Sequence, residues 1–124
     1  MADRYLRNKD LIDQKKLDSI TVIGAGGIGS ALLQNAAIMG FKEITVWDPD
    51  KLEEHNLSTT SWPEKYLNQP KVYAASKTCR ELNSKCKIKI HSAFWQTGRP
   101  LENKVFLTPD NMECRLAVYN QWKQ

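Results

Sequence analysis

The segment Gly24-Ala25-Gly26-Gly27-Ile28-Gly29 constrains the fold more than any other part of this sequence. It directly follows the β-branched run 20–23, which predicts a buried strand, and it opens into residues 28–39, which have helical spacing of apolar side chains. Glycine permits a tight turn and lets backbone N–H groups approach a ligand closely. The N-terminus of a helix also favours an anion. The segment therefore predicts a phosphate-binding turn between a strand and a helix.

A second strand is predicted over residues 43–47 and ends at Asp48. A carboxylate at the tip of this strand, about 20 residues after the glycine turn, suits hydrogen bonds from ribose hydroxyls. NAD and ATP both bind to such turns, so the turn does not choose between them. A tight strand-to-helix connection without a ligand is the alternative interpretation.

The remaining elements follow from periodicity and turn residues. Residues 54–70 predict a long surface loop, and residues 71–82 predict a helix. Strands are expected at 87–91 and 104–107, and Asp110 or Asn111 can cap a helix that runs to Trp122. The apolar face predicted for the first helix consists of Ile28, Leu32, Leu33, Ala36, Ala37 and Met39.

The order β-α-β-α-β-β-α predicts an α/β fold of Rossmann-like type, with a mainly parallel sheet flanked by helices. We expect a single nucleotide-binding domain over 1–124, with an N-terminal helical arm at 1–18 and a Rossmann-like core at 19–124.

Composition excludes several classes of protein. The net charge of +4 is spread along the chain without a run of like charge, so no nucleic-acid partner is expected. The 3 cysteines form no C-x-x-C pair, which argues against a disulfide framework and a zinc site. No stretch approaches the roughly 20 apolar residues needed to cross a membrane. We therefore expect a cytoplasmic protein.

Several segments together resemble the ThiF/MoeB/HesA family of ubiquitin-activating-enzyme-like adenylating domains. The resemblance lies in residues 4–7, 20–30 and 48–57, in Asn68-Gln69-Pro70-Lys71-Val72, and in residues 109–115. The fourth segment has Asn68 where the family's G-x-x-K element has glycine. The resemblance implies a domain that binds ATP and Mg²⁺ and adenylates the C-terminal carboxylate of a ubiquitin-like or sulfur-carrier protein.

The resemblance also implies roles for individual residues. Cofactor contacts would come from the glycine turn, the acidic loop and the later motifs, namely Gly24, Gly26, Gly27, Gly29, Asp48, Asp50, Asn56, Lys71, Asp110 and Asn111. Lys71 would neutralise the phosphates and Asp110 would bind magnesium. Arg7 resembles an arginine that family members donate to a neighbouring subunit, which implies a homodimer or a heterodimer with an adenylating subunit. Asp110 could instead be only a helix cap, and Asn56 an Asx-turn residue.

Two departures from the family pattern bear on activity. Thr59 stands where the family has a phosphate-binding arginine, and Lys65 or Arg99 are candidates to replace its charge. The chain is also short relative to the family and corresponds to its N-terminal half. These departures leave open a non-catalytic partner or scaffold subunit. An NAD-dependent oxidoreductase is the third alternative, although no Tyr-x-x-x-Lys pair or catalytic histidine follows the turn.

Overall fold

The computed structural model describes residues 17–101, 104–108 and 112–124. Its elements are β1 (Ser19–Ile23), α1 (Gly27–Met39), β2 (Glu43–Trp47), the 3-10 turns η3 (Glu54–Asn56) and η4 (Glu64–Tyr66), α2 (Lys71–Leu82), β3 (Lys87–His91), β4 (Lys104–Leu107) and α3 (Met112–Trp122). The predicted order of strands and helices is confirmed. The helical arm expected at 1–18 lies almost wholly outside the described residues.

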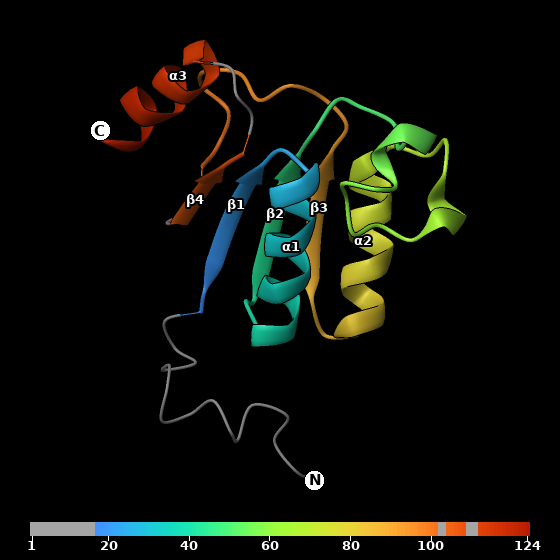
Figure 1. Ribbon diagram of the computed structural model, residues 1–124. Coiled ribbons are helices and arrows are strands. Elements are labelled where there is room, and N and C mark those ends of the chain that lie inside the picture. The colour runs from blue at the N-terminus through green and yellow to red at the C-terminus, as the bar shows by residue number, and fades with distance from the viewer. Residues whose placement is uncertain (1–16, 102–103, 109–111) are drawn as a thin grey trace, which may run out of the picture.

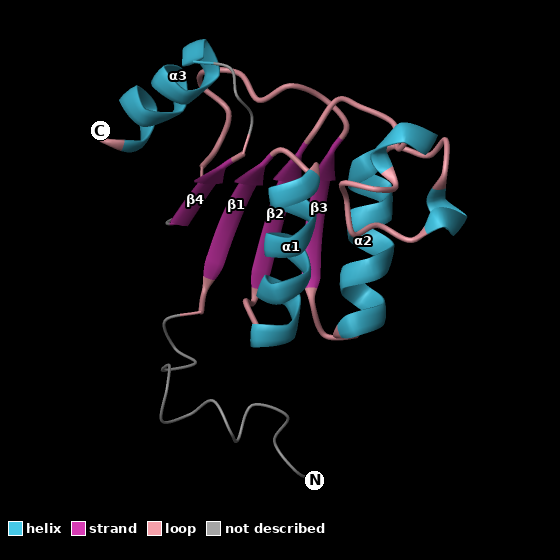
Figure 2. Cartoon of the chain, in the orientation of Figure 1, coloured by secondary structure: helices cyan, strands magenta, loops and turns pink. Residues whose placement is uncertain are grey.

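The four strands form one parallel sheet in the order β3-β2-β1-β4. Figure 1 shows α1 and α2 lying on the same side of this sheet, with α3 beyond the end of β4. Because all pairings are parallel, the carboxyl ends of the strands lie at one edge. The connections that follow β1 and β2 therefore gather at the arrowheads (Figure 2). Ligands of open α/β sheets bind at this edge.

Alternation along the central strands creates the main core. Ile20 and Val22 of β1, with Ile44 and Val46 of β2, are almost fully buried in one cluster with side chains of α1 and α2. The helices contribute mainly small residues here, which lets their backbones approach the sheet closely. A second, smaller cluster joins Ile23 and Trp47 to Trp95 and to Val118 of α3.

One prediction about α1 is wrong. Ile28, assigned to the apolar face, is 75% exposed. The buried residues of the helix are Gly29, Ser30, Leu33, Ala36 and Ala37. Ile28 precedes Gly29 by one position, which rotates it by about 100° from that face, so its side chain projects from the first turn into solvent. Among the described residues, no helix has the length and apolarity required to span a membrane.

Candidate functional site

The glycine turn is held tightly between β1 and β2. Gly24 has a positive φ of 104°, and its N–H donates to the carbonyl of Trp47 at 2.8 Å. A Cβ atom on Gly29 would lie 2.0 Å from the carbonyl oxygen of Gly24, so the turn closes on itself without room for a side chain. Gly26 is the N-cap of α1 and provides no side-chain acceptor. The first N–H groups of the helix, which lack intrahelical partners, therefore remain suited to an anion.

Asp48 connects the end of β2 to this turn. Its side chain is buried, and one carboxylate oxygen accepts a hydrogen bond from the N–H of Ala25 at 2.8 Å. The other accepts one from the N–H of Asp50, also at 2.8 Å. These bonds fix the orientation of the carboxylate. Each carboxylate oxygen can accept a further bond, so the group remains able to receive a hydroxyl.

Lys71 begins α2 and lies close to the same edge. Its N–H donates to the carbonyl of Asp50 at 2.9 Å, and the residue is only 9% exposed. No ion pair to Lys71 occurs within the described ranges. A cation at a helix N-terminus opposes the helix dipole, and a largely buried charge is costly without a partner. This end of α2 therefore favours an anionic ligand.

Asn68 stands where the family's G-x-x-K element has glycine, and its backbone conformation accounts for this difference. It has a φ of 70°, in the left-handed region, and its N–H donates to the carbonyl of Leu52 at 2.7 Å. Glycine adopts this conformation without strain, and asparagine does so more readily than other residues. The substitution thus preserves the backbone that leads into Lys71.

We expect Asn68→Ala to lower the free energy of unfolding by about 1 kcal/mol, because the left-handed conformation costs alanine roughly that amount. The free energy of unfolding of Asn68→Gly should stay within about 0.5 kcal/mol of that of the natural chain. Glycine adopts the left-handed conformation without strain, but it loses more conformational entropy on folding. Urea denaturation of the two variants checks this prediction. Equal stability of the alanine and glycine variants would contradict a left-handed residue 68.

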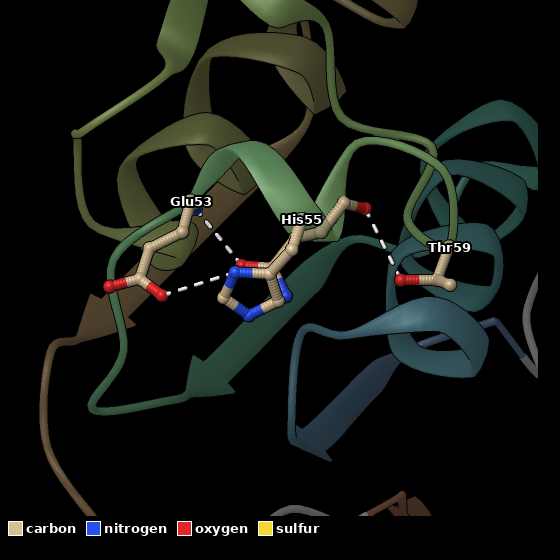
Figure 3. Close-up of polar contacts among 4 residues, drawn as sticks. Glu53, His55 and Thr59 are labelled. Atoms are coloured by element: carbon tan, nitrogen blue, oxygen red, sulfur yellow. Dashed lines mark hydrogen bonds and ion pairs between the residues drawn. The ribbon is translucent and has the colours of Figure 1, made fainter.

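The segment after Asp50 turns sharply at η3. The side-chain oxygen of Asn56 accepts a bond from the N–H of Glu53 at 2.9 Å, while Thr59 donates its hydroxyl to the Asn56 carbonyl at 3.3 Å. Figure 3 shows the His55 side chain turned toward Glu53, which it contacts at 3.5 Å, and Thr59 on the other side of the turn. The Asn56 side chain thus forms a capping box with Glu53, which differs from the Asx turn considered above, and the phosphate role of Asn56 stays a prediction.

Residues 59–62 lie over the glycine turn through contacts that sequence reasoning missed. Trp62 donates its indole N–H to the carbonyl of Ala25 at 2.8 Å, and Ser61 bonds to the hydroxyl of Ser30 through its N–H and its own hydroxyl, each at 3.0 Å. A Cβ atom on Gly27 would lie 2.7 Å from the carbonyl oxygen of Thr59. No sequence pattern marks the bond of Trp62 to the turn.

A cavity of about 130 Å³ opens beside Gly24 and Asp48. Its walls include aromatic side chains from β2 and from the segment after β3, namely Trp47, Phe94 and Trp95. The indole N–H groups of Trp47 and Trp95 are buried and have no hydrogen-bond partner within the part of the chain that the structure describes. Apolar walls with a few polar groups are typical of small-molecule sites. The sequence did not predict Phe94 or Trp95 here, since they follow a different strand from the glycine turn.

Cys114 of α3 also lines this cavity, and burial raises the pKa of its thiol. Burial likewise raises the pKa of Cys79, to about 12. A raised pKa reduces the thiolate fraction and hence nucleophilic reactivity. Cys79 is also fully buried in the main core cluster.

The structure thus brings together the glycine turn, Asp48, Asp50 and the start of Lys71's helix, with Asn56 nearby in the segment that leads to Trp62. Arg7, Asp110 and Asn111 lie outside the described residues. Within those residues, no three His, Cys, Asp or Glu side chains cluster as a metal site would require. The two residues considered as substitutes for the missing arginine make other contacts in the structure. Lys65 pairs with Glu81 at 3.3 Å, and Arg99 lies over the Trp47 ring at 5.3 Å.

Comparison with solved structures supports the architecture. The tRNA N6-threonylcarbamoyladenosine dehydratase TcdA of E. coli superposes on this chain with a TM-score of 0.83 at 20% sequence identity. The superposition covers 94% of this chain and 54% of TcdA. At this identity the likeness establishes the fold alone. The microcin C7 biosynthetic enzyme MccB, in complex with N-formylated MccA, gives a TM-score of 0.67 at 25% identity over 72% of this chain and 29% of that one.

Comparison with curated proteins and with family models identifies the family. The adenylyltransferase and sulfurtransferase MOCS3-1 of Zea mays is 40% identical to this chain over 96 residues. The match covers 71% of this chain and 20% of MOCS3-1. The human ubiquitin-like modifier-activating enzyme 6 is 33% identical over 116 residues, 81% of this chain and 11% of that protein. The chain therefore spans a fifth or less of these relatives. The model of the ThiF family matches residues 4–121, so the chain belongs to the ThiF family.

Proposed function

We propose that this chain is an ATP-binding adenylating module that activates the C-terminal carboxylate of a ubiquitin-like or sulfur-carrier protein. Its similarity to the adenylyltransferase MOCS3-1 and to a ubiquitin-like modifier-activating enzyme supports ATP over NAD as the nucleotide. The partner class follows from the same relatives, the proposed dimer follows from the family resemblance, and the proposed cytoplasmic location follows from the composition of the sequence.

The observation that carries the proposal is that the N-termini of α1 and α2 both lie at the carboxyl edge of the sheet (Figure 2), with Lys71 as the first residue of α2. The N-terminus of α1 has a glycine cap without a side-chain acceptor, and neither helix has an acidic residue in its first turn. Lys71, a residue that is 9% exposed, adds a positive charge at the start of α2. Polyphosphate is the ligand whose charge complements such a site.

The nucleotide would therefore place its phosphates at the glycine turn and Lys71, with its ribose hydroxyls on Asp48. The cavity lined by Trp47, Phe94 and Trp95 would take the base. In the reaction, a carboxylate oxygen of the carrier protein bonds to the α-phosphorus, and the bond to the pyrophosphate leaving group breaks. Two anions approach each other in this step, so the surrounding positive charge lowers its barrier.

Three further residues remain part of the proposal on the basis of sequence motifs. Asp110 would hold Mg²⁺, which supplies charge neutralisation for the pyrophosphate when bound, and Asn111 would lie beside the nucleotide. Arg7 would act in the neighbouring subunit of a dimer. Asp48 is assigned to the ribose in this arrangement, because two backbone hydrogen bonds fix the orientation of its carboxylate.

Calorimetry with MgATP tests the proposal. Lys71→Met should weaken binding by about 10- to 100-fold, because a charge-assisted contact contributes roughly 1.5–3 kcal/mol. Asp48→Asn should weaken it by at least about tenfold through loss of the charged acceptor. Lys77→Met provides the matched control, since Lys77 is exposed on the same helix. Equal weakening by Lys71→Met and Lys77→Met would show that only net charge matters.

A non-catalytic partner subunit is the second candidate, and Thr59 is the observation that favours it. Thr59 occupies the place of the expected arginine, bonds to Asn56 and presents its carbonyl toward Gly27. ATP-dependent pyrophosphate exchange separates the two functions. Exchange by this chain with its carrier protein supports adenylation, whereas MgATP binding without exchange supports the partner subunit. Thr59→Arg should then raise exchange if the missing charge is the cause.

A further inference from the structure

A basic stripe follows the edge strand β3 on the face of the sheet opposite α1 and α2. Among the described residues β3 pairs with β2 alone, so its other backbone edge is unpaired there. Lys87, Lys89 and His91 occupy alternate positions, and alternate residues of a strand share one face. Ile88, between them, belongs instead to the core cluster with α2. The stripe therefore faces away from α2.

A cavity of about 310 Å³ lies at the upper end of this stripe and is lined by Thr45, Trp47, Lys89, His91, Arg99 and Pro100. Trp47 and His91 stack with ring centroids 3.8 Å apart and planes at 13°. The guanidinium of Arg99 lies 5.3 Å from the centre of the Trp47 ring. Aromatic stacking fixes these groups while leaving the cation available. An opposing charge lies beside the stripe, since Glu43 contacts Lys89 at 3.8 Å.

The other side of the same edge is apolar. Ile90 lies between Lys89 and His91 and is 40% exposed, although it is a β-branched residue in a strand of the sheet. A strand added beside β3 would thus meet cations on one face and an isoleucine on the other. This two-sided pattern matches a segment in which side chains of opposite character alternate.

We propose that the free edge of β3 binds an extended peptide segment in which acidic residues alternate with apolar residues. The backbone of the segment would pair with β3, as in β-strand addition to an exposed sheet edge. Its carboxylates would face Lys87, Lys89 and Arg99, and its apolar side chains would cover Ile90. No nucleotide is required, so the proposal stands independently of ATP binding.

The chemistry of the site favours a carboxylate-bearing peptide over a free phosphate. Phosphate sites commonly use converging backbone N–H groups at a helix N-terminus, and the cavity here is lined by strand and loop residues. The planar guanidinium of Arg99 suits a carboxylate. The spacing of Lys87 and Lys89 matches the repeat of an adjacent strand, which a single small anion cannot exploit.

Binding should depend on pH through His91. Partial burial, and then the charges of Arg99 and Lys89, lower the pKa of its imidazole. The charged groups that face it are Lys89 on its own strand and Arg99 from the segment after β3, with Glu43 of β2 reached through Lys89. A bound carboxylate offsets these cations and raises the pKa of His91. The added affinity is complete below the free-state pKa and is lost as pH rises through the bound-state pKa.

Fluorescence anisotropy with a dye-labelled peptide of alternating glutamate and valine tests the proposal on the full chain without nucleotide. We expect affinity to increase by about three- to tenfold between pH 8 and pH 5.5, where glutamate is still ionised. Lys89→Gln with Arg99→Gln should weaken binding by at least about tenfold. Lys85→Gln, which removes an exposed charge from the turn before β3, should change it by less than about twofold. His91→Gln should abolish the pH dependence.

Two altered peptides identify the mode of binding. A peptide of the same composition with its glutamates contiguous, and one N-methylated at alternate positions to remove backbone donors, should each bind more weakly by about tenfold. Equal binding of the contiguous peptide would overturn strand addition in favour of simple charge attraction. Inorganic phosphate that competes as well as the peptide would overturn the peptide assignment. Absence of binding would mean that the lysines only protect the edge from unwanted pairing.

Discussion

Replacing Gly29 with alanine is expected to destabilise the chain by at least about 3 kcal/mol, since overpacking against atoms that cannot move is strongly unfavourable. The added Cβ would lie 2.0 Å from the carbonyl oxygen of Gly24 and 2.9 Å from its carbonyl carbon. These are backbone atoms of a turn that is bonded to β2. The turn must therefore open, and the strand-to-helix connection is lost with it. Urea denaturation measures the loss, provided that the variant folds at all.

Gly26→Ala is the matched control within the same turn. A Cβ there meets no atom within 4 Å, and the φ of −82° lies outside the left-handed region that favours glycine. We expect stability within about 1 kcal/mol of the natural chain. If the glycine serves the ligand rather than the fold, the same variant should bind MgATP at least about tenfold more weakly. A stable Gly29→Ala variant would contradict the closed turn, and unimpaired MgATP binding by Gly26→Ala would contradict close approach of the phosphates.

Trp62→Ala is expected to lower the free energy of unfolding by about 3–5 kcal/mol, the usual range for removal of a buried tryptophan. Trp62 is 3% exposed and belongs to the main core cluster. Its indole also supplies the hydrogen bond to the Ala25 carbonyl. Loss of this side chain should therefore weaken both the core and the attachment of residues 59–62 to the glycine turn.

Trp62→Phe separates these two effects. Phenylalanine retains most of the apolar contact but leaves the Ala25 carbonyl without its donor, at a cost of about 1–3 kcal/mol. Trp122→Ala offers a comparison, because Trp122 is 55% exposed, and its effect should be less than half that of Trp62→Ala. Denaturation curves for all three variants check the order. A Trp62→Phe variant as stable as the natural chain would show that the indole bond contributes little.

Local signals in the sequence were sufficient for most of the fold. The β-branched runs at β1 and β2 and the glycine turn between β1 and α1 each depend on neighbouring residues, and each was predicted at or within one residue of its observed bounds. The register of the sheet was not predicted, because the central strands are buried on both faces and their apolar pattern does not set the pairing. The same locality explains the error at Ile28, where apolar character suggested burial but the small residues of α1 contact the sheet.

The candidate site was predictable only where it is contiguous along the chain. The glycine turn and Asp48 belong to one strand-helix-strand unit, so their spacing carries information. Trp62, Phe94 and Trp95 reach the same edge from later connections. Their positions depend on how those connections return over the sheet, which no pattern in a single sequence specifies. The capping box that Asn56 forms with Glu53 differs from both roles considered for it, a phosphate contact and an Asx turn.

The hydrogen bonds from Ala25 to Asp48 and from Trp62 to Ala25 have a consequence for how a ligand would be received. Asp48 and Trp62, which are remote in sequence, hold the glycine turn through hydrogen bonds to Ala25. The turn is therefore preorganised, and little conformational entropy remains to be lost on binding. Hydrogen exchange should therefore be slow at the Ala25 amide even without ligand. Binding should add protection chiefly at the unbonded amides of the first turn of α1, leaving the remainder of the sheet unchanged.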